Sequence, residues 1–215
     1  MKIDNCIQGS PAWFTARLGK LTASRASDML STVKDPKKEA AGRRNLRIQL
    51  VLERVTGKRQ ASEFVSAAMQ QGSEREADAA GLYEAITGNL LSSVGFCQHD
   101  TLMAGCSPDG YINHFEGVVE VKSPLPATHW DYLRSGVIPG EYEKQITAAL
   151  WITGAKWCDW LSFNPDFPPT LQVKLVRVER NEAEIDAFEL SARLFLKEIE
   201  RDVDELAKLA GLVAA

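Results

Sequence analysis

The sequence predicts an α+β fold in which a mixed central β-sheet is flanked by helices. Three observations favour this class: helical patterns in the first part of the chain, short strand patterns in the middle, and one long amphipathic stretch at the end. The 215 residues are most simply one domain, large enough to bury roughly 70% of its unfolded surface. We divide it into a basic helical N-terminal part, a central core and a C-terminal helix, over residues 1–59, 60–180 and 181–215.

Helical patterns dominate the N-terminal part, and some have recognisable ends. Ser10 is a good N-cap and is followed by a proline, which suits the first helical position. Ser24 is expected to cap the next helix. The expected helices cover residues 10–19, 25–33, 39–55 and 62–87. The last of them should pack on its neighbours through Ala77, Ala80 and Tyr83.

The middle of the chain predicts strands. Residues 92–98 are expected to form one strand, and residues 103–122 resemble a β-hairpin with a polar turn at residues 113–117. The second arm of this hairpin is rich in valine, which is typical of a buried strand. Two more strands are expected over residues 156–163 and 171–178, and the second of these alternates strictly between apolar and polar residues.

Helices follow the hairpin and also end the chain. Residues 127–135 and 141–153 are expected to be helical, with glycine and proline between them. Residues 181–210 predict a long amphipathic helix with a single apolar stripe. That stripe consists of Ile185, Phe188, Ala192, Phe195, Ile199, Val203, Leu206 and Ala210.

Composition excludes several classes of protein. The sequence has no run of 18 apolar residues and its first residues have no signal-peptide core, so we expect a cytoplasmic protein without a membrane span. Its four cysteines lack the spacing of a metal site and are expected to be reduced thiols. With only three histidines in the chain, a zinc site is not expected.

Charge is distributed unevenly along the chain. Residues 1–59 carry 13 Lys/Arg against 5 Asp/Glu, a net charge of +8. Residues 60–215 carry 12 against 24, a net of −12, which accounts for the overall charge of −4. A concentration of positive charge is typical of a surface that binds phosphate groups, although a solvated helical face gives the same pattern.

The hairpin carries the chemically most informative residues. Asp109 lies in its first arm, and Glu120 and Lys122 lie in its second arm. Because side chains alternate along a strand, Glu120 and Lys122 point to the same face, where the first arm can place Asp109 beside them. Two converging carboxylates repel each other unless a cation lies between them, and oxygen ligands suit Mg²⁺ or Mn²⁺. A lysine there can orient a water or help to remove its proton, which fits metal-assisted phosphodiester hydrolysis.

An exposed hairpin with a solvated Glu–Lys pair would contain the same residue types. The valines of the second arm argue against that reading, because charges on a buried strand need a partner or a metal.

Pro108-Asp109 followed by Glu120-Val121-Lys122 resembles the signature of the PD-(D/E)xK nuclease superfamily. More narrowly, the chain resembles the phage lambda exonuclease family, also called YqaJ-type viral recombinases. The motifs that carry this resemblance follow the family's order over most of the chain. They are Gln8–Trp13, Ala16–Gly19, Leu21–Ser24, Gly72–Ala79, Cys106–Gly110, Glu120–Pro124 and Gln145–Trp151.

This resemblance implies a restriction-endonuclease-like PD-(D/E)xK core and a Mg²⁺-dependent 5′→3′ exonuclease. Its substrate would be linear double-stranded DNA, which it would convert to 3′ single-stranded overhangs for recombination by single-strand annealing. The resemblance places a third metal-contacting carboxylate, Glu76, on a helix. The implied metal ligands are Glu76, Asp109, Glu120 and the backbone carbonyl of Val121, enough for two Mg²⁺ ions, with Mn²⁺ as a substitute.

Two further side chains complete the implied catalytic set. Lys122 is expected to orient the attacking water and to offset charge on the phosphorane-like transition state. Gln145 is expected near that water or near the lysine.

The resemblance also implies a pocket for a 5′-phosphate. Arg17 is expected to bind the phosphate bidentately, and Ser24 adds a hydroxyl donor. Trp13 is expected to shape this pocket or to pack in the core, and Arg25 is expected to contact DNA.

The chain departs from the family's pattern at one phosphate-binding position. The family has an arginine shortly after its Glu-x-Lys strand, where this chain has Thr128. Either another cation replaces it, such as Arg134 or one from residues 34–47, or the preference for a 5′-phosphate is weaker.

Assembly is implied as well: a ring-shaped homotrimer threaded by DNA and a single-strand annealing protein as partner, in a bacterial host cell. Two other functions stay open at this point, a PD-(D/E)xK endonuclease or junction resolvase and a catalytically inactive DNA-binding protein. The joint presence of Asp109, Glu120 and Lys122 argues against the inactive protein. A glycoside hydrolase is remote, because Lys122 would have no role in one.

Overall fold

The computed structural model describes residues 1–35, 37–60 and 67–211, and for residues 67–74 the backbone alone. The α+β class is confirmed, but the strands form two mixed four-stranded sheets instead of one central sheet. The first sheet has the order β1-β3-β4-β2 and the second the order β5-β6-β7-β8. The first sheet consists of β1 (Lys2–Asp4), β3 (Phe96–Gln98), β4 (Ala104–Cys106) and β2 (Leu21–Thr22).

The second sheet contains the longer strands and lies at the centre of the fold. It consists of β5 (Gly110–Ile112), β6 (Gly117–Lys122), β7 (Trp157–Phe163) and β8 (Val173–Glu179). β6 and β7 run parallel, and the other two pairs are antiparallel. A parallel pair needs a crossover, which the chain makes through two helices between β6 and β7.

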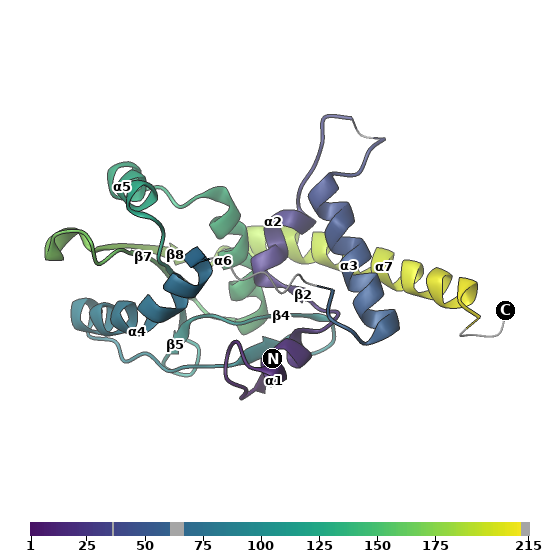
Figure 1. The fold of residues 1–215 in the computed structure, drawn as a ribbon, viewed down its shortest axis with the longest axis horizontal. Helices are drawn as coiled ribbons and strands as arrows, with labels where there is room; N and C mark the ends of the chain where they lie inside the picture. Colours follow the sequence, from purple (N-terminus) through teal and green to yellow (C-terminus); the bar gives the residue numbers. More distant parts are fainter. Residues whose placement is uncertain (36, 61–66, 212–215) are drawn as a thin grey trace.

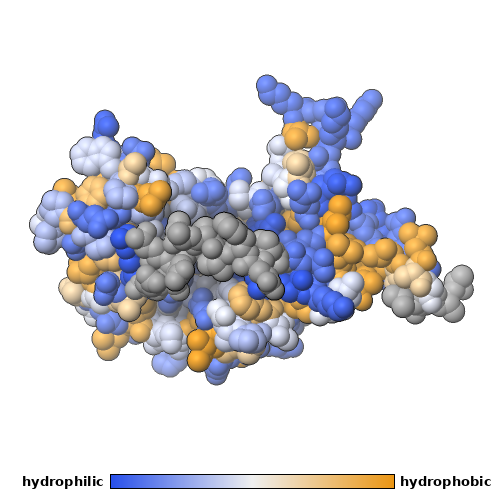
Figure 2. All heavy atoms as spheres, in the orientation of Figure 1, coloured by the Kyte–Doolittle hydropathy of each residue, from blue (hydrophilic) through white to orange (hydrophobic). Residues whose placement is uncertain are grey.

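Some helices contact this sheet and others lie beside it (Figure 1). The helices are α1 (Pro11–Arg17), α2 (Ala26–Met29), α3 (Ala41–Thr56), α4 (Ala67–Thr87), α5 (Pro126–Ser135), α6 (Gly140–Thr153) and α7 (Glu182–Leu209). Figure 1 shows α3 crossing α7, whose C-terminal end extends beyond the rest of the molecule. Figure 2 shows apolar side chains gathered along this end, and a hydrophilic loop projecting between α2 and α3. No described helix is long and apolar enough to cross a membrane.

Two sequence-based boundaries were wrong. The first arm of the expected hairpin is not one strand: it divides into β4 and β5, which belong to different sheets. Pro108 lies at the break, where a residue without a backbone N–H cannot continue a ladder. The helix expected over residues 25–33 is only the four-residue α2, preceded by a 3₁₀ turn at Ala23–Arg25.

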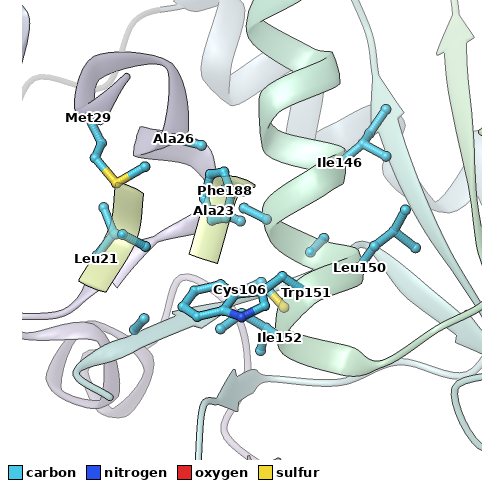
Figure 3. Close-up of a cluster of buried hydrophobic side chains, with 14 of the residues drawn as sticks. Leu21, Ala23, Ala26, Met29, Cys106, Ile146, Leu150, Trp151, Ile152 and Phe188 are labelled. Carbon is cyan, nitrogen blue, oxygen red and sulfur yellow. The ribbon is translucent and has the colours of Figure 1, made fainter. Parts of the chain in front are cut away.

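The two faces of the second sheet pack against different helices. Val118, Cys158 and Trp160 pack with α6 and α7 in the larger core, part of which is shown in Figure 3. Val119 and Leu161 point to the opposite face and pack with α4. Strand alternation therefore sends neighbouring residues of β6 to opposite sides of the sheet.

The packing side of α4 matches the expected one at Tyr83 but not at Ala77. Ala79 and Tyr83 are buried, whereas Ala77 is exposed and Ala80 is half-buried. The helix is rich in alanine, so its sequence contains little periodicity to identify the buried side. Residues 62–66 of the expected helix lie outside the described residues. On α7 the expected stripe is buried as far as Ile199, half-buried at Val203 and Leu206, and exposed at Ala210.

Candidate active site

The break between β4 and β5 places Asp109 against the edge of β6. The Asp109 amide donates to the carbonyl of Val119 over 3.0 Å, and its Oδ2 accepts the amide of Val121 over 2.5 Å. Two backbone contacts with one strand therefore fix both the position and the orientation of this carboxylate. The expected pairing of Asp109 with the second hairpin arm is present.

Glu120 and Lys122 lie on the same face of β6, the face toward α6. Lys122 Nζ lies 3.2 Å from Glu120 Oε2, and the same oxygen accepts a hydrogen bond of 2.6 Å from Gln145 Nε2 on α6. Glu120 is only 2% exposed. The sequence-predicted glutamine thus contacts the carboxylate, while the lysine lies between that carboxylate and the ring of Tyr142, 5.2 Å from its centre.

One pocket of about 530 Å³ contains most of the predicted site residues. Glu76 reaches it from α4 with an exposed side chain. The sequence-predicted residues that line it are Trp13, Arg17, Ser24, Glu76, Asp109, Glu120, Val121, Lys122 and Gln145. Ser107 and Tyr142 also line it and were missed from the sequence, although Ser107 directly precedes the Pro-Asp pair.

Burial sets the electrostatics of the carboxylates. It raises the pKa of Glu120 to about 7, an effect that Lys122 opposes and Asp109 reinforces. The pKa of Asp109 is also raised by burial, against the attraction of Lys122 and the Val121 amide. The pKa of Glu76 is raised as well: although much of the residue is exposed, its carboxylate is partly withdrawn from solvent in the pocket, and the charge of Asp109 adds to the effect. All three groups would therefore gain from additional positive charge.

Lys122 behaves in the opposite sense. Burial lowers its pKa, but the charges of Glu120 and Asp109 outweigh burial, so its pKa lies above the usual range for lysine. Lys122 is therefore an ammonium group in this structure. It can orient a water or stabilise negative charge, and it lacks the free lone pair that a general base needs.

The donor set fits a hard divalent cation. Glu120 Oε1 is buried and has no hydrogen-bond partner among the described residues. Carboxylate and carbonyl oxygens are the ligands that Mg²⁺ and Mn²⁺ prefer. The groups that could hold such ions are the carboxylates of Glu76, Asp109 and Glu120 and the carbonyl of Val121. Within the described part of the chain, no group of three or more His, Cys, Asp or Glu already has the spacing of a metal site.

The other side of the pocket suits an anion. The Arg17 guanidinium lies over the ring of Trp13, 4.0 Å from its centre, and donates to Ser107 Oγ over 3.3 Å. Trp13 Nε1 donates to the same oxygen over 2.8 Å. Burial lowers the pKa of Arg17 to about 10, and no described carboxylate forms an ion pair with it. The Ser24 hydroxyl lies 3.3 Å from that of Thr22 at the edge of this region.

Other predicted cations lie elsewhere. Arg25 does not line the pocket: it donates to Asp28 over 2.7 Å and to Gln49 over 3.1 Å. Arg134 lines a separate hollow beside α5. Arg43 and Arg47 on α3 form ion pairs with carboxylates of α7, so part of the N-terminal positive charge holds two helices together.

Comparisons with known proteins agree with this arrangement. A protein family, the YqaJ-like viral recombinase domain, matches residues 12–156 of this chain. Among solved structures, an alkaline exonuclease (LHK-Exo) from Laribacter hongkongensis is similar, with 35% sequence identity and a TM-score of 0.85. That similarity covers 95% of this chain and 100% of the other. LHK-Exo in complex with dAMP gives the same values.

A more distant structure shares the fold. A phage-related exonuclease from Haemophilus somnus 129PT has 12% identity and a TM-score of 0.69, over 87% of this chain and 96% of that one. A search of curated proteins gave no significant match. The PD-(D/E)xK nuclease fold expected from the sequence is thus confirmed.

Proposed function

This chain belongs to the YqaJ-like viral recombinase family and is a nuclease, and from that premise we propose that it is a Mg²⁺-dependent 5′→3′ exonuclease. Its substrate is the end of linear double-stranded DNA, and its product is a 3′ single-stranded overhang for recombination by single-strand annealing. One observation carries the proposal: a single pocket joins a carboxylate set that favours cations to the half-buried Arg17, which favours an anion. A phosphodiester bound through a divalent cation satisfies both.

The metal-binding side of the pocket supports hydrolysis. When bound, Mg²⁺ neutralises charge on the phosphate and makes a water more acidic. Asp109, Glu120, Glu76 and the Val121 carbonyl are the groups that hold it. Gln145 fixes Glu120 Oε2, which leaves Oε1 free for the ion. Lys122 remains a cation that orients the attacking water and stabilises the charge that develops on the phosphate oxygens.

The arginine side of the pocket supports recognition of a strand end. A terminal phosphate carries more charge than an internal diester and has more free oxygens. Arg17 is held in place by Trp13 and Ser107, so little side-chain freedom is lost when it binds the phosphate. The Ser107 oxygen accepts two hydrogen bonds, which leaves its own hydroxyl proton to donate to a ligand. Ser107 therefore supplies one neutral donor on the arginine side, while Thr128 does not line the pocket.

Digestion of labelled DNA tests this function. Linear duplex with 5′-phosphate ends should be degraded to mononucleotides in the presence of Mg²⁺ or Mn²⁺, linear duplex with 5′-hydroxyl ends more slowly, and closed circular duplex not at all. Loss of label from the 5′ end before the 3′ end gives the direction. Cleavage of the closed circle would instead support the endonuclease or resolvase reading, and no cleavage of any substrate would support an inactive DNA-binding protein.

We further propose that the protein acts as a homotrimer with a single-strand annealing protein, in the cytoplasm of a bacterial host. A chain of net charge −4, whose basic residues partly pair with its own carboxylates, has little free positive surface to retain DNA through many steps. Three copies around an axis could enclose the duplex, and cyclic symmetry closes such a ring. Light scattering should give about three times the 23.7 kDa chain mass. A monomeric mass, with processivity abolished by competitor DNA, would contradict the ring and leave the nuclease function standing.

A further inference from the structure

A buried polar network lies on the face of the second sheet that packs against α4. Asp159 on β7 is 1% exposed and is bound through both oxygens by Arg177 on β8, over 2.8 Å at Nε and 2.8 Å at NH2. The guanidinium of Arg177 in turn lies over the ring of Trp157, 3.7 Å from its centre. The Asp159 carboxylate therefore has a fixed position on the sheet.

Tyr83 connects α4 to this fixed carboxylate. Its side chain is fully buried, and its hydroxyl donates to Asp159 Oδ2 over 2.8 Å. Burial raises the pKa of Tyr83 to about 12, and the neighbouring carboxylate adds to the effect, so the hydroxyl remains a donor throughout the working pH range. This hydrogen bond can form only when α4 has one position along its axis and one rotation about it relative to the sheet.

Among the described side chains of α4, residues 75–87, only Ala79 and Tyr83 are buried. Leu82 packs against the same cluster but is half-buried, and Arg75 pairs with the exposed Asp166 over 3.7 Å. These two contacts reach solvent, so they restrain the helix less tightly than a buried hydrogen bond does. Tyr83 is thus the one large buried anchor among these residues, where α4 packs against β6 and β7 (Figure 1).

Glu76 lies seven residues before Tyr83 on the same helix. Seven residues make nearly two full turns, so both side chains project from one side of α4, about 10.5 Å apart along its axis. Tyr83 meets the sheet face, and Glu76 reaches the pocket that contains Asp109 and Glu120. A small slide or rotation of the helix would move the Glu76 carboxylate by a similar amount, and metal ligands tolerate displacements of only about 0.5 Å.

We propose that Tyr83 is a positioning residue: its hydrogen bond to Asp159 fixes α4 so that Glu76 meets the other carboxylates of the pocket. The inference rests on the proposed function, because it takes Glu76 as a metal ligand. It also gives the ion pair a role: Arg177 is exposed and Asp159 is buried, so the pair holds the acceptor of Tyr83 in place on the sheet.

Direct Mn²⁺ binding, measured by calorimetry without DNA, tests the proposal. Tyr83→Phe removes the hydroxyl and keeps the ring, and it should weaken Mn²⁺ binding about tenfold, as loss of an outer-sphere support typically does. Asp159→Asn should change Mn²⁺ affinity in the same direction. Glu198→Gln is the matched control: it removes a partner of Arg43 between α3 and α7, and it should lower thermal stability with Mn²⁺ affinity unchanged.

A double-mutant cycle separates positioning from general damage to the structure. In a Glu76→Ala background, Tyr83→Phe should no longer change Mn²⁺ affinity, because the ligand that it positions is absent. An equal loss in both backgrounds, or no loss in the wild-type background, would overturn the positioning role and leave the nuclease function intact. A wild-type protein that neither bound Mn²⁺ nor cleaved DNA would overturn the proposed function, and the role of Tyr83 with it.

Discussion

The two sides of the pocket are assembled in different ways and are electrostatically opposite. On one side, Asp109, Glu120 and Lys122 come from one hairpin region of the chain, within 14 residues. On the other, Arg17 and Trp13 come from α1 and meet Ser107 about 90 residues later in the sequence. Burial favours neutral carboxylates on the first side and lowers the pKa of the arginine on the second. A pocket with both features is complementary to a cation and a phosphate together.

The difference assigns separate tasks to the two sides. The hairpin side holds the groups that can act on the scissile phosphate, so changes there should remove the chemical step. The arginine side holds no carboxylate or lysine of the hairpin set, so changes there should alter which DNA end is accepted. Variants on the hairpin side should therefore lose turnover, and variants on the arginine side should lose the preference for one kind of DNA end.

Loss of the hairpin charges should have the largest effect. Lys122→Ala removes a preorganised cation and should lower turnover at saturating Mg²⁺ by at least about 100-fold, roughly 3 kcal/mol of transition-state stabilisation. Asp109→Ala and Glu120→Ala should abolish cleavage and also weaken Mn²⁺ binding, which Lys122→Ala should leave intact. Single-turnover digestion and calorimetry measure the two quantities. Turnover close to wild type in Lys122→Ala would remove the lysine from the mechanism.

Loss of the half-buried Arg17 should have a smaller and more selective effect. Hydrogen bonds to charged groups contribute about 1.5–3 kcal/mol, so Arg17→Ala should slow digestion of 5′-phosphorylated ends about 10- to 100-fold. Digestion of 5′-hydroxyl ends should slow much less. Arg25→Ala is the matched control, because Arg25 pairs with Asp28 and Gln49 outside the pocket. Equal slowing of both ends by Arg17→Ala would make it a general backbone contact.

Mg²⁺ binding to the hairpin side of the pocket should depend on pH. Because the pKa of Glu120 is raised to about 7, its contribution to the stability of the metal-free protein is present at acid pH and is lost as pH rises through 7. Mg²⁺ binds the ionised carboxylate, so it should bind about tenfold more weakly for each pH unit below 7. Mg²⁺ should therefore raise the unfolding temperature more at pH 8.5 than at pH 6. A larger rise at pH 6 would contradict the assignment. Glu120→Gln should reduce the difference, and Asp109 and Glu76, whose pKa values are also raised, should account for what is left.

Side chains that lie close in the sequence could be predicted to meet, whereas contacts between distant segments could not. Glu120 and Lys122 were predicted to share a face because strand periodicity is local. Ser107 was missed because its importance arises from contacts with α1, which no local pattern contains. The placement of Arg25 outside the pocket, bonded to Asp28 and Gln49, was also not predicted, since a basic residue in sequence does not reveal which acidic neighbour the fold supplies.

The fold shows the same limit. Strands β6, β7 and β8 and helices α3, α6 and α7 were predicted with small boundary errors, because their patterns are strong. The short strands β1 and β2 were not predicted, and the strand expected over residues 92–98 is only β3. The division of the first hairpin arm between two sheets was not predicted, although Pro108 at the break is the residue least able to continue a ladder. The buried side of α4 was misplaced because alanine packs almost equally well on any side. Tyr83 was the one informative residue of that helix, and its partner Asp159 is 76 residues away.

Ser107 offers the smallest and most specific test of the comparison, because it lies where the two sides meet. Its oxygen accepts from Trp13 and Arg17, and two residues later the chain places Asp109 against β6. Ser107→Ala leaves both donors without that acceptor and removes the hydroxyl donor. Since the charge of Arg17 remains, the preference for 5′-phosphate ends should fall only about three- to fivefold, near the 1 kcal/mol of an ordinary hydrogen bond. Mn²⁺ affinity should stay at the wild-type value, and Ser107→Thr should restore the preference in part. If Ser107→Ala weakened metal binding as strongly as end recognition, the two sides would form one cooperative unit.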